Sequence, residues 1–496
     1  MTSIRTACIA IASLALLIAA DVSPAAVASP KVDKGVYAPS PAPLLPAAGG
    51  TFRDPDFGTQ ILRLTDAADG STNHVAYSYW PTFNKDSTYL HISRSGTPTL
   101  YQFDPDSFQV VSKGPLFTKN TPIGTRPGWE DSIWSATDPN VLYAHEGPRL
   151  WAWNVATKTY TLVKDFTSVL PAGEGLGQMS RSMDDNVFAF SRKLYQSPWS
   201  VTGYAAWQRD TNTMLASALT TSLDEVQVDK SGRYMTIKTG AGSVDVLVKD
   251  FLTGTLAGLT DGSPDYSPGH SDNGSGIVVG ADNWTNRYTG RSLANPHSVY
   301  TVLSFGSDWS QASHVSMLAD GDQWALLSMT TGNAHASNGI YKDEILMVAT
   351  DGSQRVIRLA HHRTDYRATG NYWDLPLANI SRDGRFVAYT SNWGNSGRED
   401  VYILRVPPAG DANLDYMVDD DDLSMMLANW GTAGKWEGGD FTANGMVNDD
   451  DLSLLLSNWT GSGGGQSTGQ NIPEPATIGL LILGGLGLLG RRRRRA

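Results

Sequence analysis

Cysteine is almost absent from this 496-residue chain, which contains only Cys8, within its first 28 residues. The rest of the chain therefore has no disulfide, no thiolate metal site and no thiol nucleophile. Positive charge is also scarce, because 38 Lys and Arg stand against 50 Asp and Glu, which gives a formal net charge of −12. A chain this acidic lacks the basic surface that nucleic-acid binding requires, so we expect no nucleic-acid partner.

The first 28 residues have the layout of a secretory signal peptide. Arg5 precedes an apolar core at 9–20, and Ala-Val-Ala at 26–28 forms a cleavage site of small residues. A leader of this kind is removed on export and is not part of the fold. We therefore expect an exported protein in which residues 29–49 form a linker.

One sequence unit recurs seven times between the termini: an apolar strand, a polar turn with Asp, Asn or Gly, and a second β-rich strand. The turns are about 42 to 63 residues apart, and most are followed by another hairpin. Four short strands at such a period are typical of a propeller blade. We therefore predict an all-β fold, a seven-bladed β-propeller over residues 50–406, in which a strand at 61–64 completes the last blade. A pair of β-sandwiches is the competing fold. The seven turns lie at 83–90, 134–142, 179–188, 228–235, 270–277, 317–324 and 380–387.

The last of these turns carries a more specific pattern. The segment Ser-Arg-Asp-Gly-Arg-Phe-Val-Ala-Tyr-Thr-Ser-Asn-Trp at 381–393 resembles blades of TolB-like propellers and of the seven-bladed oligogalacturonate lyases. The resemblance spans roughly residues 50–406 and implies a fold more than a chemistry. Those lyases place a Gln and spaced His residues around manganese. Their Gln-x-x-His-x-His arrangement is not found here, so the sequence leaves open whether the propeller holds a divalent metal.

Propellers bind ligands at the axial ends of the central channel, so we look for site residues near the ends of the inner strands. His270, His314 and His362 each precede a blade turn and are the candidate catalytic residues, because a uronate lyase needs a base for the C5 proton. A structural hydrogen-bonding role is the alternative for each of these histidines. The candidate ligand-binding residues are Trp80, Arg181, Arg363 and Tyr366.

Two copies of an acidic loop follow the propeller, and each leads into an amphipathic helix. Counted from Asp411 and from Asp440, oxygen-bearing side chains fall at loop positions 1, 3, 5, 9 and 12. This spacing suits Ca²⁺, which takes six or more oxygen ligands. A solvated acidic surface is the alternative, but two copies in register favour Ca²⁺. The predicted ligands are Asp411, Asn413, Asp415, the Met417 carbonyl, Asp419 and Asp422, then Asp440, Thr442, Asn444, the Met446 carbonyl, Asn448 and Asp451.

This duplicated loop and helix, over residues 410–460, resembles a type I dockerin module. The resemblance implies a small α-helical fold with two calcium sites and a cohesin-like protein partner. Tyr416 stands at position 6 of the first loop, where the family has a turn glycine, so we expect backbone strain there. The positions that choose the partner in cellulosomal dockerins are aspartates in both copies, so no particular partner is implied.

A glycine- and serine-rich linker at 461–472 precedes the last segment of the chain. Residues 473–496 contain Pro-Glu-Pro at 473–475, an apolar run at 476–490 and five arginines at 491–495. This order resembles the PEP-CTERM sorting signal, which implies a transmembrane helix, tethering at the inner membrane and processing by an exosortase. An ordinary C-terminal anchor is the alternative.

The combined expectation is an exported protein that is tethered at the inner membrane and then reaches the cell surface or the extracellular matrix. Its propeller binds an extracellular polysaccharide or a protein partner. A propeller-type uronate lyase is the alternative function. A structural protein of an exopolysaccharide or biofilm matrix is the third.

Overall fold

The computed structural model describes residues 28–461, except for short segments at 119–121, 124–127, 129–130, 198–199, 240–245, 261–267, 283 and 332–338. The predicted signal peptide, up to residue 27, and the predicted sorting signal with its transmembrane helix lie outside the described residues. The chain divides into two units, one ending at Val406 and the other beginning at Pro407. Within the described residues, no helix is both long and apolar enough to cross a membrane.

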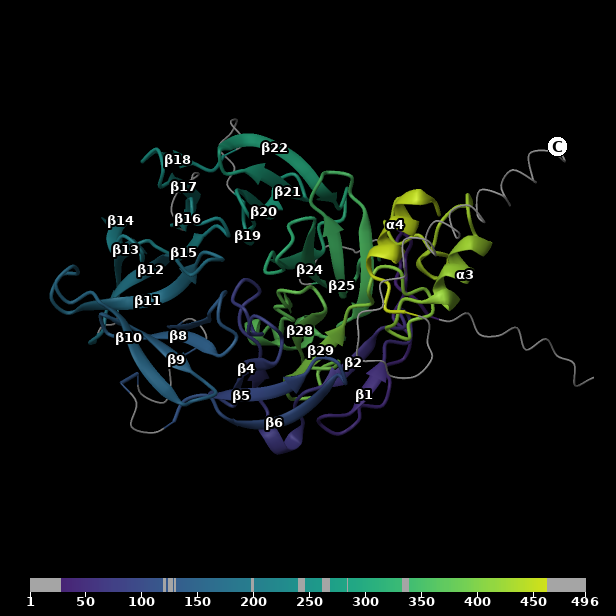
Figure 1. The fold of residues 1–496 in the computed structure, drawn as a ribbon, viewed down its shortest axis with the longest axis horizontal. Coiled ribbons are helices and arrows are strands. Elements are labelled where there is room, and N and C mark those ends of the chain that lie inside the picture. The colour runs from purple at the N-terminus through teal and green to yellow at the C-terminus, as the bar shows by residue number, and fades with distance from the viewer. Residues whose placement is uncertain are drawn as a thin grey trace, which may run out of the picture. The chain divides into compact units, whose positions relative to one another are not determined.

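Seven antiparallel sheets make up the first unit, and they confirm the predicted seven-bladed all-β propeller (Figure 1). Blades 1 to 6 each use four consecutive strands, so each blade is a meander of hairpins. Blades 1 to 3 contain β3 (Asn73–His74), β4 (Tyr89–Arg94), β5 (Thr97–Asp104), β6 (Gln109–Pro115), β7 (Ser132–Trp134), β8 (Val141–Glu146), β9 (Arg149–Asn154), β10 (Thr159–Asp165), β11 (Glu174–Arg181), β12 (Val187–Leu194), β13 (Val201–Gln208) and β14 (Thr213–Leu219). Blades 4 to 6 contain β15 (Glu225–Val228), β16 (Tyr234–Lys238), β17 (Val246–Asp250), β18 (Leu256–Gly258), β19 (Ser271–Asn273), β20 (Ile277–Asp282), β21 (Arg287–Ser292), β22 (Asn295–Ser304), β23 (Gln311–Ser316), β24 (Trp324–Thr331), β25 (Glu344–Ala349) and β26 (Val356–His361).

The seventh blade joins the two ends of the propeller. It contains β27 (Asn379–Ile380), β28 (Phe386–Ser391) and β29 (Asp400–Arg405), together with β2 (Gln60–Arg63) and β1 (Thr51–Arg53) from the start of the unit. β2 pairs with β29 through Ile61 and Leu404 and through Leu62 and Ile403, which confirms the predicted closing strand (Figure 1). β1 adds a fifth strand that the sequence pattern did not predict.

The repeated polar turns join the innermost strand of a blade to the next strand. In blade 4, between β15 and β16, the Asp229 carboxylate accepts from the backbone N–H of Tyr234 at 2.8 Å. Gly232 in this turn has a φ of 76°, a left-handed conformation that glycine adopts readily. The same carboxylate accepts from the N–H of Gly276 in blade 5 at 2.9 Å. The side chain of Asp229, in the turn of blade 4, therefore also connects blade 4 to blade 5.

Residues 29–49, predicted to be a linker, run against blade 6. Lys31 forms a β-bridge with Arg358 of β26, and Arg358 donates to the carbonyl of Gly35 at 2.6 Å. The side chain of Arg358 is fully buried in an ion pair with Glu344. This segment is therefore packed on the propeller and is not a free linker.

The second unit contains two short helices, α3 (Asp420–Ala428) and α4 (Asp449–Ser457), and the single turn η4 (Trp436–Gly438). Each of the two helices follows one of the acidic loops and begins with a capping box. Met426 and Leu455 are fully buried, but Leu427 and Leu456 are exposed, so the apolar faces predicted for the helices are only partly covered. Among the described residues of the propeller, helical turns in the loops include η1 (Ala67–Asp69), α2 (Tyr366–Thr369) and η3 (Tyr372–Asp374).

Candidate functional site

Two of the predicted histidines meet on the side of the propeller where the innermost strands begin. His270 precedes β19 and His314 lies in β23, and their rings are nearly parallel with centroids 4.3 Å apart. Tyr77, which follows β3, packs edge-on against His314 with centroids 5.1 Å apart. The hydroxyl of Tyr372 in η3 lies 3.3 Å from His314 Nε2. We call His270, His314, Tyr77 and Tyr372 the mouth cluster.

The mouth cluster favours neutral imidazoles. Desolvation by the surrounding protein lowers the pKa of His270, although the residue is partly exposed to solvent. Desolvation also lowers the pKa of His314 well below its usual value, and the charges of His270 and Lys238 add to the effect. His270 Nδ1 lies 3.1 Å from the carbonyl of Ser313. Because a carbonyl only accepts, Nδ1 carries the proton and Nε2 is left as the acceptor.

The phenols and one ion pair complete this region. Burial raises the pKa of Tyr77 and of Tyr372, so both hydroxyls stay protonated at neutral pH. Lys238 forms a buried ion pair with Glu225, and its ammonium lies 5.1 Å from the ring centroid of Tyr79. The region therefore offers neutral bases, phenol donors and aromatic faces. The sequence analysis did not select the two tyrosines, although an aromatic run at 77–80 was a signal for the first.

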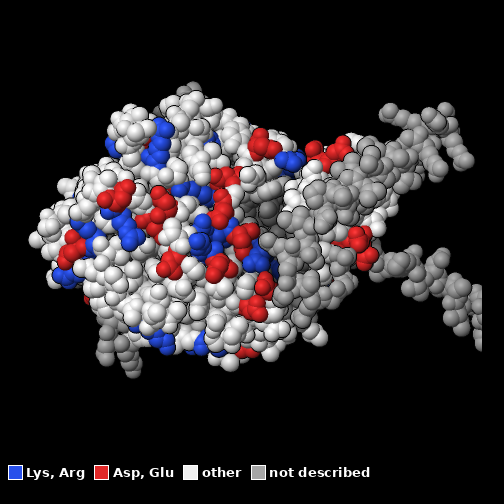
Figure 2. All heavy atoms as spheres, in the orientation of Figure 1, with Lys and Arg blue, Asp and Glu red and all other residues white. Residues whose placement is uncertain are grey.

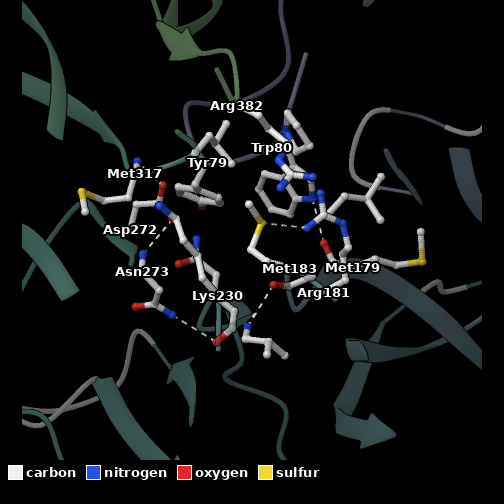
Figure 3. A pocket seen from close by; sticks show the side chains of 16 residues that line it. Tyr79, Trp80, Met179, Arg181, Met183, Lys230, Asp272, Asn273, Met317 and Arg382 are labelled. Atoms are coloured by element: carbon white, nitrogen blue, oxygen red, sulfur yellow. Dashed lines mark hydrogen bonds between the residues drawn. The ribbon is translucent and has the colours of Figure 1, made fainter. Parts of the chain in front are cut away.

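Trp80 and Arg181 lie further along the central channel, where the innermost strands end. A cavity of about 50 Å³ in this place is lined by residues of all seven blades (Figure 3). Trp80 donates to the Met179 carbonyl at 2.9 Å, and Arg181 donates to the Trp134 carbonyl at 2.8 Å, so both side chains connect blades. Burial lowers the pKa of Arg181 to about 10, against the charge of Asp185 3.3 Å away. Such a cavity has room for a few water molecules but not for a sugar ring.

The other three predicted residues follow β26. His362 is fully buried, with Nε2 2.6 Å from the carbonyl of Met329 and Nδ1 accepting from the N–H of Thr364 at 3.0 Å. Both of its ring nitrogens are therefore bonded to the backbone, which is a structural role. Arg363 and Tyr366 line a larger cavity of about 320 Å³ on blades 6 and 7, which we call the rim pocket.

Beside the rim pocket, Asp54, Asp56 and His361 form a group that could hold a metal ion, because their ligand atoms lie within 4.8 Å of one another. Their atoms already have protein partners. Asp56 lies 3.0 Å from His361 Nδ1 and accepts from Arg363 at 3.2 Å. Burial raises the pKa of Asp54 to about 6, although its oxygens accept backbone N–H groups. The guanidinium of Arg363 supplies the positive charge that a metal would otherwise bring.

The two acidic loops of the second unit share one backbone conformation. Position 4 has positive φ in both loops, 61° at Leu414 and 55° at Ala443. Position 6 also has positive φ in both, 68° at Tyr416 and 90° at Gly445. Tyr416 therefore adopts the left-handed conformation that was expected to be strained, because a Cβ disfavours it.

Carboxylates of these loops are buried together. Asp411, Asp422, Asp440 and Asp451 are fully buried, and Asp411 Oδ1 has no hydrogen-bond partner in the part of the chain that the structure describes. Burial, and then the charge of Asp422, raises the pKa of Asp411 to about 7. Burial also raises the pKa of Asp422 and of Asp440. Both oxygens of Asp422 accept backbone N–H groups of its own loop.

Residues 471–495 match a family model described as the PEP-CTERM protein-sorting motif. This motif marks an exported protein that is held at the membrane until an exosortase processes it and is then found at the cell surface. A search of curated proteins finds no match.

Many solved structures are similar to the propeller, and two of them are described here. One is an oligogalacturonate lyase from Vibrio parahaemolyticus, with 14% identity over 72% of this chain and 96% of that chain and a TM-score of 0.53. The other is an oligogalacturonate lyase in complex with manganese, with 15% identity over 73% of this chain and 97% of that chain and a TM-score of 0.51. At such low identity the likeness shows the fold, which is the seven-bladed propeller found here.

Proposed function

We propose that the propeller binds an extracellular polysaccharide at the mouth cluster. The observation that carries this proposal is the open edge of the cluster, where His270 and Tyr372 are exposed beside the buried ring of Tyr77. Aromatic faces of this kind stack on the apolar faces of sugar rings. The neutral imidazoles and protonated phenols offer acceptors and donors to sugar hydroxyls.

The test is polysaccharide binding by the purified protein and by two tyrosine variants. Tyr372→Ala removes the exposed ring of the mouth and should weaken binding about fivefold or more, because a stacking residue contributes more than about 1 kcal/mol. Tyr300→Ala is the matched control, since Tyr300 is exposed to a similar degree on β22, the outermost strand of blade 5. Equal loss in both variants, or in neither, would contradict the proposal.

A uronate lyase is the second candidate, because the two solved structures described above are oligogalacturonate lyases. β23 carries Gln311-x-x-His314, the first part of the arrangement expected of those lyases. Ser316 stands where the last histidine would be, and its hydroxyl accepts from the N–H of Ile380 at 3.4 Å. The second histidine of the Gln-x-x-His-x-His arrangement is therefore missing.

The arrangement of the mouth cluster also does not fit the manganese of the neighbouring structure. A metal lies in the plane of each imidazole that binds it, because the nitrogen lone pair lies in that plane. The rings of His270 and His314 are stacked with an interplanar angle of 23°, so they cannot both point at one ion. An elimination here would instead rest on a neutral histidine as the base and Tyr372 as the acid.

One assay separates these two functions. Absorbance of unsaturated uronate products is followed in the same samples that are used for binding. Binding with a flat absorbance trace supports the binding function. A rising absorbance trace that His314→Ala abolishes supports the lyase. If the protein neither binds a glycan nor produces a rise in absorbance, a structural protein of the extracellular matrix is favoured.

We further propose that residues 410–460 form a dockerin-like module with two Ca²⁺ sites. The buried carboxylate of Asp411, with one oxygen unpaired among the described residues, supports this proposal, because buried charge requires a partner. The matching backbone of the two loops supports two similar sites. A cohesin-like protein is the partner that such a module implies, and calcium-dependent capture of a cohesin domain tests it, with chelated protein as the control.

A further inference from the structure

Two buried acids lie behind the turn that carries Tyr372 of the mouth cluster. Asp374 ends the turn η3, two residues after Tyr372, and is 3% exposed. Glu399, which precedes β29 in the neighbouring loop, is 8% exposed. Asn371 Nδ2 donates to Asp374 Oδ1 at 3.2 Å and to Glu399 Oε1 at 3.0 Å. The two carboxyl groups therefore lie side by side, and we call them the acid pair.

No basic side chain forms an ion pair with either acid in the part of the chain that the structure describes. Arg398 is next to Glu399 in the sequence, but its guanidinium is bound by both oxygens of Asp400. The other donors to Asp374 are neutral, namely the Thr369 hydroxyl and the Asn392 amide. The acid pair is therefore buried without a compensating positive charge.

The other titratable groups near the acid pair lie on elements packed against η3. His74 of β3 stacks on Trp373 with centroids 5.3 Å apart, and burial lowers the pKa of this histidine, so it is neutral at pH 7. Asp365, the N-cap of α2, and Arg367 within α2 are both exposed. β28 carries no charged side chain. The charge of this region is therefore set mainly by the two buried acids.

One hydrogen bond is missing when both acids are ionised. Glu399 Oε2 is buried and accepts no hydrogen bond from the described residues. Carboxylate oxygens only accept, so two ionised acids cannot bond to each other, whereas a proton on Glu399 makes it a donor to Asp374. Burial, and then the hydrogen bond with Asp374 and its charge, raises the pKa of Glu399 to about 7. One proton therefore completes the bond and removes the repulsion between like charges.

The turn η3 connects the acid pair to the mouth cluster. The Tyr372 hydroxyl lies 3.3 Å from His314 Nε2, and the Tyr372 ring is nearly parallel to that of Tyr77, with centroids 6.4 Å apart. The turn has only three residues, so a displacement of Asp374 also displaces Tyr372. The Asn371 side chain caps the turn and binds both acids. The position of the exposed mouth ring therefore depends on the acid pair.

We propose that Asp374 and Glu399 share one proton, and that this proton fixes Tyr372 in the mouth cluster and makes glycan binding depend on pH. Both acids are positioning residues, because they act through Tyr372. The raised pKa of Glu399 means that the pair stabilises η3 fully below about pH 4.5 and loses this contribution as the pH rises to about 7. The effect on glycan binding rests on the proposed function of the propeller, whereas the shared proton does not.

Hydrogen exchange of residues 367–377 in the full chain tests the shared proton without a glycan. Glu399→Gln keeps an oxygen acceptor for Asn371 and gives Asp374 a permanent N–H donor, so it reproduces the protonated pair at every pH. The two proteins are compared at the same pH, so that intrinsic exchange rates cancel. They should exchange equally at pH 5, and the wild type should exchange about tenfold faster at pH 8.

Asp365→Asn is the matched control for this exchange measurement. It removes an acid just before the same segment, and asparagine also caps helices, so its exchange should equal that of the wild type at both pH values. Equal exchange of the wild type and Glu399→Gln at pH 8 would overturn the shared proton.

Binding of polygalacturonate, used as the glycan probe, tests the connection to the mouth cluster. The wild type and Glu399→Gln should bind equally at pH 5, and the wild type should bind about tenfold more weakly at pH 8. Glu399→Ala cannot form the bond and should bind weakly at both pH values. Equal binding by the wild type and Glu399→Gln at pH 8 would overturn the positioning of Tyr372. If no form binds the probe but the exchange difference is present, the shared proton is supported and the proposed glycan function is not.

Discussion

The two units of this protein treat buried charge in opposite ways. In the propeller, several buried acids have basic partners, as Glu344 has in Arg358 and Glu174 has in Arg192 at 2.6 Å, although the buried Asp272 is bonded only to backbone N–H groups. In the second unit, Lys435 is the only basic residue between 407 and 461. Space-filling Figure 2 shows acidic and basic side chains interspersed over one face of the propeller. The propeller therefore neutralises much of its buried charge internally, whereas in the second unit the proposed Ca²⁺ ions take the place of basic partners.

The largest expected effect is the unfolding of the second unit when a chelator removes the proposed Ca²⁺. A chelator should make residues 407–461 sensitive to protease while the β-sheet circular dichroism of the propeller stays unchanged, because structural metal binding contributes directly to folding. Asp411→Asn and Asp440→Asn should each produce part of this loss. Equal protease resistance with and without chelator would remove the contrast between the units.

Destabilising the propeller should instead require a substitution in its hydrophobic core. Leu62→Ala, in the closing strand β2, truncates a fully buried side chain and should lower the free energy of unfolding by about 2–5 kcal/mol. Denaturant unfolding should show this loss equally in calcium and in chelator. Leu427→Ala, at an exposed position of α3, is the control and should change stability by less than about 0.5 kcal/mol.

Lowering the pH should change the stability of the two units in opposite directions. Burial lowers the pKa of His91 to about 4, and neither of its ring nitrogens has a partner among the described residues. The unfolded chain binds this proton below pH 6.5 and the folded chain does not, so stability falls as the pH drops from 7 to 5, by about 2 kcal/mol for His91. His91→Leu should flatten the pH dependence of thermal unfolding. Metal-free residues 407–461 should respond in the opposite sense, because the raised pKa of Asp411 makes its protonated form the stable one.

The smallest expected effect lies within the second unit. Tyr416→Gly should stabilise the first loop by about 1 kcal/mol, because glycine adopts a φ of 68° without the cost of a Cβ. Gly445→Ala is the mirror experiment in the second loop, where an added Cβ would meet no atom within 4 Å. It should cost a similar amount through the backbone alone. Calcium titration of the two variants measures the two changes in loop stability. If both substitutions stabilised their loops, backbone strain at position 6 would be contradicted.

The fold was predictable because its signals are local and repeated. Seven polar turns fixed the number of blades, and the apolar pattern at 61–64 identified the closing strand. β1 was missed because it has only three residues, none of them buried. The packed extension at 29–49 was missed because its main contact, Lys31 with Arg358, joins residues that are far apart in the sequence.

The candidate site was only partly predictable. His270 and His314 were selected for their place before blade turns, and their stacking depends on how adjacent blades approach, which no local pattern encodes. His362 had the same local signal but is bonded to the backbone on both ring nitrogens.

The closing strand also sets the order in which this protein can mature. Arg63 in β2 and Asp400 in β29 form an ion pair at 2.7 Å across 337 positions of the chain. During export, the ring stays open until residues up to 405 have crossed the membrane. Contacts this distant in sequence are slow to form, so the open ring exposes the edges of its first and last blades in that interval. A tail that keeps the chain at the membrane gives the ring time to close before release.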